Sequence, residues 1–189
     1  MPEITKKITP TSRKDWRAWL KKNHKKEKII WLIHHKRHTN KHFISHRESL
    51  EEAICFGWID TIIKRIDHDT YARCFMRRTE KSRWSNNTLS YAKDMIKQKK
   101  MTAEGLKRYK EGLKKPSLDV GIPKNPEPQP DLLEALKKKN LLEQFHNIAP
   151  SYKRYYVRWL ERAKRPETRQ KRIEAILQQI LHNRKPGAN

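Results

Sequence analysis

Apolar and polar residues follow two different spacings along the chain, which predicts a mixture of helices and strands. Residues 16–20 hold two tryptophans and a leucine that would share one helical face. The run at 28–33, KIIWLI, is short, β-branched and bounded by charge, which is typical of a buried strand. The polar, histidine-rich stretch 34–44 is expected to be a loop.

Capping signals mark where the first helices begin. Ser12 is followed three residues later by Asp15, and Ser45 by Glu48. Both pairs have the form of a capping box, in which the two side chains satisfy each other's free backbone N–H groups. Gly57 favours the left-handed conformation that ends helices, so the second helix is expected to stop just before it.

A β-hairpin is predicted near the middle of the chain. Strand-type residues run from Trp58 to Ile66 and again from Tyr71 to Arg78. The four residues between the runs, DHDT, are typical of a turn. Further on, Ser85 and Thr102 each precede an apolar stripe at helical spacing, and both are expected to cap helices.

Proline changes the pattern in the second half. Residues 116–130 contain five prolines and are expected to form an extended linker. Beyond the linker, helices are predicted to start at Asp131, at Ser151 as a cap, and at Pro166, where proline suits the first helical position.

These elements predict an α+β fold. A small antiparallel β-sheet or hairpin packed with helices is expected over 1–115. The proline-rich linker follows over 116–130, and a helical C-terminal segment over 131–189.

Composition adds a strong positive charge. The chain has 45 Lys and Arg against 21 Asp and Glu, a formal net charge of +24. Residues 1–100 carry 25 of those basic groups and 11 of the acids, so the charge is spread rather than gathered in one arm. An evenly basic surface favours generic contacts with polyanions over the reading of bases. Nucleic-acid binding is therefore retained as the alternative function.

Several classes of protein are excluded or disfavoured. No run approaches the 18 apolar residues that a membrane-spanning helix needs, and the N-terminus has no apolar core of a signal peptide. Cys55 and Cys74 are too few for a disulfide framework, so a reducing cytoplasm is expected and both are interpreted as buried hydrophobic residues. None of the five glycines belongs to a nucleotide-binding motif, and no cofactor is expected.

Histidines 34, 38, 42 and 46 recur every fourth residue and would form a metal-binding ladder on one continuous helix. That helix is not expected, because the segment joins a strand to a capping box. Acids, the usual partners of metal-ligating histidines, are absent from 28–47. No metal site is therefore predicted.

The segment 55–87 is the most informative for function. Alternation places Trp58 and Asp60 on one strand face, with alternate residues of 71–77 on the partner strand beside them. Arginine side chains and the helix start at Ser85 would suit a carboxylate or phosphate. The candidate ligand-binding residues are Trp58, Asp60, Tyr71, Arg77, Arg83, Trp84 and Ser85. The structural alternative is equally concrete: Asp60 pairs with an arginine, Arg65 or Arg77, and both tryptophans belong to the core.

The same segment resembles the YdeI/OmpD-associated family, described broadly as bacteriocin-protection proteins. The family pattern is FGWIDG, followed by an Arg-Leu-Asp turn, a Tyr, PR(R/K), SxWSxxN and, later, MTxxGL. The chain has a similar run, FGWIDTIIKRIDHDTYARCFMRRTEKSRWSNN, followed by MTAEGL. Thr61 and Met76 depart from the usual Gly and Pro. The stretch APSYKRYYVRWLERAKRPETRQKRI also looks like the closing helices of the family, so the resemblance covers about 12 to about 180.

The resemblance implies a YdeI-like domain over 1–115 and a role in tolerance of bacteriocins and antimicrobial peptides. It implies no cofactor and no agreed catalytic residues, so the catalytic residues are unknown and enzymatic activity is left open. A direct role in absorbing cationic peptides is disfavoured, because the chain itself is cationic. The expected activity is that of a binding module for another protein or a small anionic ligand.

Overall fold

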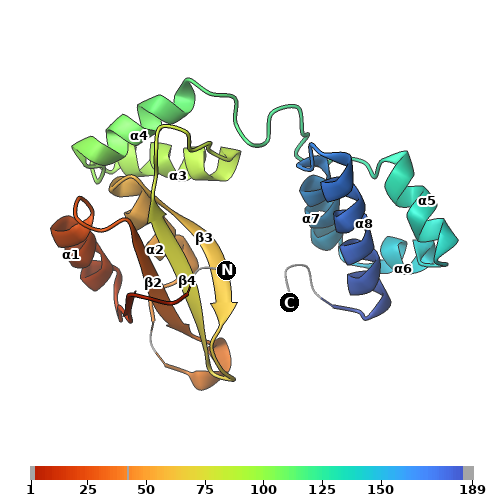
Figure 1. Ribbon diagram of the computed structural model, residues 1–189, viewed down its shortest axis with the longest axis horizontal. Coiled ribbons are helices and arrows are strands. Elements are labelled where there is room, and N and C mark those ends of the chain that lie inside the picture. The colour runs from red at the N-terminus through yellow and green to blue at the C-terminus, as the bar shows by residue number, and fades with distance from the viewer. Residues whose placement is uncertain (1–2, 42, 185–189) are drawn as a thin grey trace. The chain divides into compact units, whose positions relative to one another are not determined.

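The computed structural model describes residues 3–41 and 43–184, and it divides into two compact units. Unit 1 comprises the described residues up to Leu118, and unit 2 comprises those from Asp119 onward. Figure 1 shows unit 1 as a sheet with helices and unit 2 as a group of helices. The fold is α+β, as the sequence predicts.

Unit 1 holds all four strands of the described residues, together with four α-helices and one 3-10 turn. In chain order these are β1 (Lys7–Ile8), α1 (Arg13–Asn23), β2 (Ile29–His35), η1 (Arg37–Thr39), α2 (His46–Cys55), β3 (Trp58–Arg65), β4 (Thr70–Arg77), α3 (Asn86–Lys97) and α4 (Ala103–Leu113).

The strand order in the sheet is β1-β2-β4-β3. The predicted hairpin is confirmed as β3 and β4, and β2 pairs with β4 in antiparallel register. The short β1 pairs with β2 in parallel, so the sheet is mixed rather than wholly antiparallel as predicted. Two residues give too little alternation for a sequence pattern to identify a strand.

One face of the sheet carries the main core of unit 1. Trp16 and Leu20 of α1 pack there against Ile30, Trp58 and Phe75 of the strands, together with α2. The opposite face carries a smaller cluster of Trp31, Ala72 and Cys74. Both cysteines are buried and free, and burial raises the pKa of Cys55 to about 11, which confirms their interpretation as apolar packing residues.

The predicted helix starts of unit 1 are confirmed. Ser12 and Ser45 form reciprocal capping boxes with Asp15 and Glu48. Ser85 forms one with Thr88, and Thr102 caps α4. Gly57 has a φ of 76°, the left-handed conformation expected after α2.

Unit 2 consists of α5 (Pro130–Lys138), α6 (Leu142–Asn147), α7 (Pro150–Glu161) and α8 (Pro166–Leu181). Its core is a single cluster, which includes Leu136, Phe145, Leu160 and Ile176. No helix in the described residues has the length and apolar character that crossing a bilayer requires.

Two predicted helix starts in unit 2 are wrong by one or two residues. Ser151 is no cap, because α7 begins at Pro150 and Ala149 is its N-cap residue. Helix α5 begins at Pro130 rather than at Asp131. In both cases proline occupies the first helical turn, where its fixed φ suits the helix and no capping side chain is used. The six-residue α6 was not predicted.

The proline-rich segment has no helix or strand between α4 and α5, but it is not simply extended. Ile122 N–H donates to the Asp119 carbonyl in a turn. The Asp119 carboxylate is buried and pairs with Arg158 at 3.1 Å and with Arg162 of the same unit. The linker therefore supplies a structural anchor to unit 2.

Candidate functional site

Asp60 lies on the helix-covered face of the sheet, and its carboxylate has two partners. Arg73 Nη1 donates to Asp60 Oδ2 at 2.7 Å, and the His46 ring lies 3.0 Å from the same oxygen. Burial acts to raise the pKa of Asp60, but His46 and Arg73 together outweigh it and hold the pKa below its ordinary value. Asp60 is therefore a paired, ionised carboxylate.

The arginine partner differs from the two that the sequence suggested. Arg73 pairs with Ile63 across the hairpin, because a bulge shifts the register between Asp60 and Ile63. Because Asp60 faces Phe75, Arg73 and Arg77 are both its diagonal neighbours on β4, and strand spacing alone did not identify Arg73 as the partner.

Tyr71 contacts a buried histidine rather than a pocket. Its ring stacks on His34 with centroids 5.1 Å apart and planes 12° apart. His34 is fully buried, and within the described residues neither ring nitrogen has a hydrogen bond of regular geometry. Burial, with a further contribution from Arg73, lowers the pKa of His34 to about 4, and an interaction with the backbone of Ile44 partly offsets this.

Both tryptophans of the predicted site belong to the core. Trp58 is fully buried, with its ring edge toward Trp19 at 6.0 Å. Trp84 is 2 % exposed, and a Cβ added to Gly112 would lie 2.2 Å from its ring, so α4 covers it closely. The Arg78 guanidinium lies 3.7 Å above the same ring. Neither tryptophan is available to stack on a ligand.

The remaining predicted residues have structural partners. Arg77 donates to the Lys25 carbonyl at 3.0 Å, and Arg83 donates to the carbonyls of Pro116 and Ser117. Ser85 is occupied in its capping box with Thr88. Each of these side chains therefore already takes part in a structural contact.

The seven predicted residues therefore do not converge on one ligand site. Trp58 and Asp60 lie on the same face of the sheet, as predicted, but Trp84 and Ser85 belong to the contact with α4 and to the start of α3. The arrangement matches the structural alternative, with Arg73 as the partner of Asp60.

The four histidines at 34, 38, 42 and 46 were not expected to lie on one helix, and three of them can be located. His34 stacks on Tyr71, His46 pairs with Asp60, and His38 lies near Asp69. His42 lies outside the described residues.

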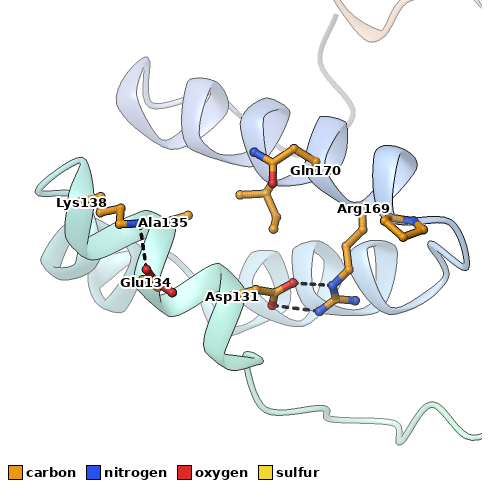
Figure 2. A pocket seen from close by; sticks show the side chains of 8 residues that line it. Asp131, Glu134, Ala135, Lys138, Arg169 and Gln170 are labelled. Carbon is orange, nitrogen blue, oxygen red and sulfur yellow. Dashed lines mark hydrogen bonds and ion pairs between the residues drawn. The ribbon is translucent and has the colours of Figure 1, made fainter.

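Unit 2 contains an open groove between α5 and α8, shown in Figure 2. One part has a volume of about 430 Å³, and a second part, which shares four lining residues with it, has about 730 Å³. We call the two parts together the α5–α8 groove. Its lining residues are Asp131, Glu134, Ala135, Lys138, Lys139, Leu141, Pro166, Arg169, Gln170, Ile173, Glu174, Leu177, Gln178 and Leu181.

The charged residues at one end of the groove neutralise each other. Figure 2 shows the Arg169 guanidinium facing the Asp131 carboxylate, to which Nε and Nη2 both donate, Nη2 at 3.0 Å. Arg169 also donates to Glu161 at 3.2 Å. The hydrogen bond from Arg169 is the main cause that lowers the pKa of Asp131. This cluster joins α5, α7 and α8 and leaves no free guanidinium for an anion.

The rest of the groove combines an apolar floor with a charged rim. Ile173 and Leu141 are nearly buried, while Leu181 is 53 % exposed. Glu134 and Lys138 form an ion pair along α5 at 2.8 Å, seen in Figure 2. The groove therefore offers shape and apolar surface rather than a reactive group.

The sequence contained part of the signal for this groove. The isoleucine and leucine stripe of the last helix is visible at i, i+3 and i+4. Which side of that stripe stays uncovered depends on how α5 packs beside α8, and no local pattern specifies that.

The fold and the site define a two-part protein: an α+β unit in which the predicted site residues make structural contacts, and a helical unit with an open groove. A family model described as a domain of unknown function, DUF8412, matches residues 8–108, more than half of the chain, and the chain belongs to that family. The model of the family described as bacteriocin-protection, YdeI or OmpD-associated, matches residues 125–183. Neither the curated proteins nor the solved structures gave a significant match.

These matches confirm the resemblance to the YdeI/OmpD-associated family and restrict its extent. The stretch that begins APSYKRYY lies inside the match, but the FGWID run lies inside the match to the domain of unknown function. The α5–α8 groove falls entirely within residues 125–183.

Proposed function

We propose that this chain acts in the cytoplasm in tolerance of bacteriocins or antimicrobial peptides, as a protein-binding module that uses the α5–α8 groove. The observation that carries the proposal is the open groove within the segment that matches the bacteriocin-protection family. Two free, buried cysteines are in keeping with a reducing compartment.

The groove favours a polypeptide over a small anion. Arg169, the arginine that lines it, is already paired with two carboxylates. A bound anion would have to compete with Asp131 and Glu161 for the same N–H donors. A small anion makes no favourable contact with the apolar floor, whereas an amphipathic helix can bury its apolar face in such a groove.

The rim suits a helix that carries charges of both signs. Lys138 and Lys139 lie on the α5 side, and Glu174 lies on the α8 side. A partner helix with acids facing α5 and a basic residue facing α8 would be complementary. The proposed occupant is therefore an amphipathic helical segment of a partner protein. Nucleic-acid binding, the alternative, rests on net charge alone.

The proposal is tested with Leu181→Glu, which places a charge at the exposed apolar end of the groove. The matched control is Tyr155→Glu, because Tyr155 is a large aromatic side chain on α7 with 46 % exposure, close to the 53 % of Leu181, and it does not line the groove. Both variants should keep the fold, since both positions are exposed.

The measurement is the bacteriocin concentration that inhibits cells lacking the gene and complemented with each variant. We expect wild type and Tyr155→Glu to restore tolerance and Leu181→Glu to lose most of it. Full tolerance with Leu181→Glu would remove the groove from the mechanism. No gain of tolerance with wild type would remove the role in bacteriocin protection.

A further inference from the structure

An exposed cluster of two histidines and an aspartate lies at one end of the sheet in unit 1. His38 comes from η1, and His68 and Asp69 come from the turn between β3 and β4. His38 Nε2 lies 2.9 Å from Asp69 Oδ1, and His68 Nδ1 lies 2.7 Å from the same oxygen. All three potential ligand atoms lie within 4.8 Å of one another.

The backbone around the cluster is held in place from both sides. The Asp67 carboxylate accepts hydrogen bonds from the N–H groups of Asp69 and Thr70, at 2.7 and 2.6 Å, which closes the turn. Lys36 N–H donates to the Asp69 carbonyl at 2.8 Å, which ties the strand before η1 to that turn. The three ligand atoms are therefore brought together by fixed backbone rather than by mobile side chains alone.

The stability of unit 1 gives no reason for this arrangement. The side chains of His38, His68 and Asp69 are 47 %, 83 % and 60 % exposed. Exposed ion pairs of this kind contribute about 0–1 kcal/mol each, because water competes with them. Two histidine rings gathered on one carboxylate oxygen are thus unexplained by packing.

We propose that His38, His68 and Asp69 form a binding site for a divalent transition-metal ion of the zinc type. Two imidazole nitrogens and one carboxylate oxygen are a donor set that suits zinc, cobalt, nickel or copper, whereas magnesium and calcium prefer oxygen donors throughout. Three protein ligands leave a further coordination position for water or for a donor from a partner.

The present spacing needs only a small adjustment to admit such an ion. Ligands about 2.0–2.1 Å from a tetrahedral metal lie about 3.3 Å apart. The two nitrogens stand 2.9 and 2.7 Å from Asp69 Oδ1, so each would move outward by about half an ångström. The two rings have centroids 4.7 Å apart and are 47 % and 83 % exposed, which leaves room for that movement.

The sequence pattern suggested a different set of residues as possible metal ligands. His38 was one of four histidines at helical spacing, and the other two ligands came from a segment interpreted only as a turn. The hairpin and η1 bring them together across 30 residues of chain, which explains why no spacing motif revealed the set.

The site is tested by titrating the untagged full chain with Zn²⁺ in a calorimeter and with Co²⁺ by visible absorption. We expect one high-affinity ion per chain, and His38→Ala and His68→Ala should each weaken binding at least about 10-fold. His182→Ala is the matched control, because His182 is an exposed histidine outside the cluster, and it should bind as wild type does.

Two results would overturn the proposal. One is the absence of Zn²⁺ binding by the wild-type chain at 100-fold excess of metal over protein. The other is equal affinity in wild type, His38→Ala and His68→Ala, which would place the ion elsewhere. Circular dichroism of each variant confirms that a loss of binding is not a loss of fold, and Asp69→Asn provides a second, isosteric variant with the same expected loss.

Discussion

The two units begin their helices in different ways. In unit 1, α1, α2 and α3 each start with a reciprocal capping box, and α4 starts with a threonine cap. In unit 2, α5, α7 and α8 start with proline in the first turn and have no side-chain cap. A capping box is a local signal between residues three apart, so the helix starts of unit 1 can be predicted from the sequence. The helix starts of unit 2 depend more on packing.

The units also differ in how they use charge. In unit 1 the nearly buried carboxylate of Glu52 joins α2 to Arg13 and Arg17 of α1. Unit 2 has a similar buried carboxylate in Asp119, which pairs with Arg158 and Arg162, but its second cluster, around Arg169, is more exposed and stands at the edge of an open groove. The Glu52 cluster of unit 1 therefore lies between two packed helices, whereas the Arg169 cluster of unit 2 lies at the edge of a groove that leaves Leu181 exposed.

The largest expected effect on stability comes from replacing a core tryptophan, and its size should differ between the two units. Trp16 is fully buried, and its ring N–H donates to the Ser49 carbonyl at 2.9 Å. Trp16→Ala should lower the free energy of unfolding of unit 1 by about 3–5 kcal/mol, because it leaves a large cavity in the core and removes a buried hydrogen bond. Trp159 in unit 2 is only partly buried, with Arg172 over its ring, so Trp159→Ala should cost less than half as much.

The two tryptophan variants are compared by hydrogen exchange of amides in β4 and in α8, each against wild type. Equal losses of protection in the two units would contradict the contrast between their cores.

Acidification should weaken unit 1 through His34. Its pKa is about 4 in the folded chain and about 6.5 when unfolded, so between these values the unfolded chain binds more protons. The contribution of His34 to the free energy of unfolding is therefore fully present above pH 6.5. It is lost progressively between pH 6.5 and pH 4, by about 3 kcal/mol in all. The pKa of Asp60 is lowered in the folded chain, so its stabilising contribution is present throughout this range and is lost only at more acidic pH.

This loss is measured by denaturant unfolding across the pH range, with β-strand amides as probes. His34→Phe should flatten the dependence between pH 6.5 and 4, while the exposed His182→Gln should leave it unchanged. A His34→Phe profile that parallels wild type would assign the effect to other groups.

The charge cluster of unit 2 should contribute less. Arg169→Ala leaves Asp131 and Glu161 without their arginine, but these carboxylates are 41 % and 24 % exposed and can be solvated. We expect a loss of about 1–2 kcal/mol in the stability of unit 2, measured by urea unfolding. A loss above about 3 kcal/mol would show that the cluster is as critical as a buried pair.

The smallest effect tests the helix starts directly. Ser45→Ala removes a capping box and should cost about 1 kcal/mol. Ser151→Ala removes a serine that looks like a cap in sequence but lies inside α7, and it should change stability by less than about 0.5 kcal/mol. Thermal unfolding of both variants measures the difference, and equal costs would mean that Ser151 acts as a cap after all.

The sequence by itself determined the elements whose signals are local. The capping serines of unit 1, the left-handed Gly57 and the alternation around the Asp67 turn predicted the helix starts and the hairpin correctly. Each depends on residues within a few positions of one another, so the pattern carries the physical cause within it.

Only the tertiary structure decided which side chains meet. The pairing of β3 with β4 set Arg73 beside Asp60, close packing of α4 closed the space around Trp84, and the hairpin brought His68 to His38. The groove of unit 2 likewise exists because α5 covers one side of α8 and leaves Leu181 open. Register and helix packing depend on contacts between residues far apart in sequence, and such contacts leave no fixed spacing in the chain.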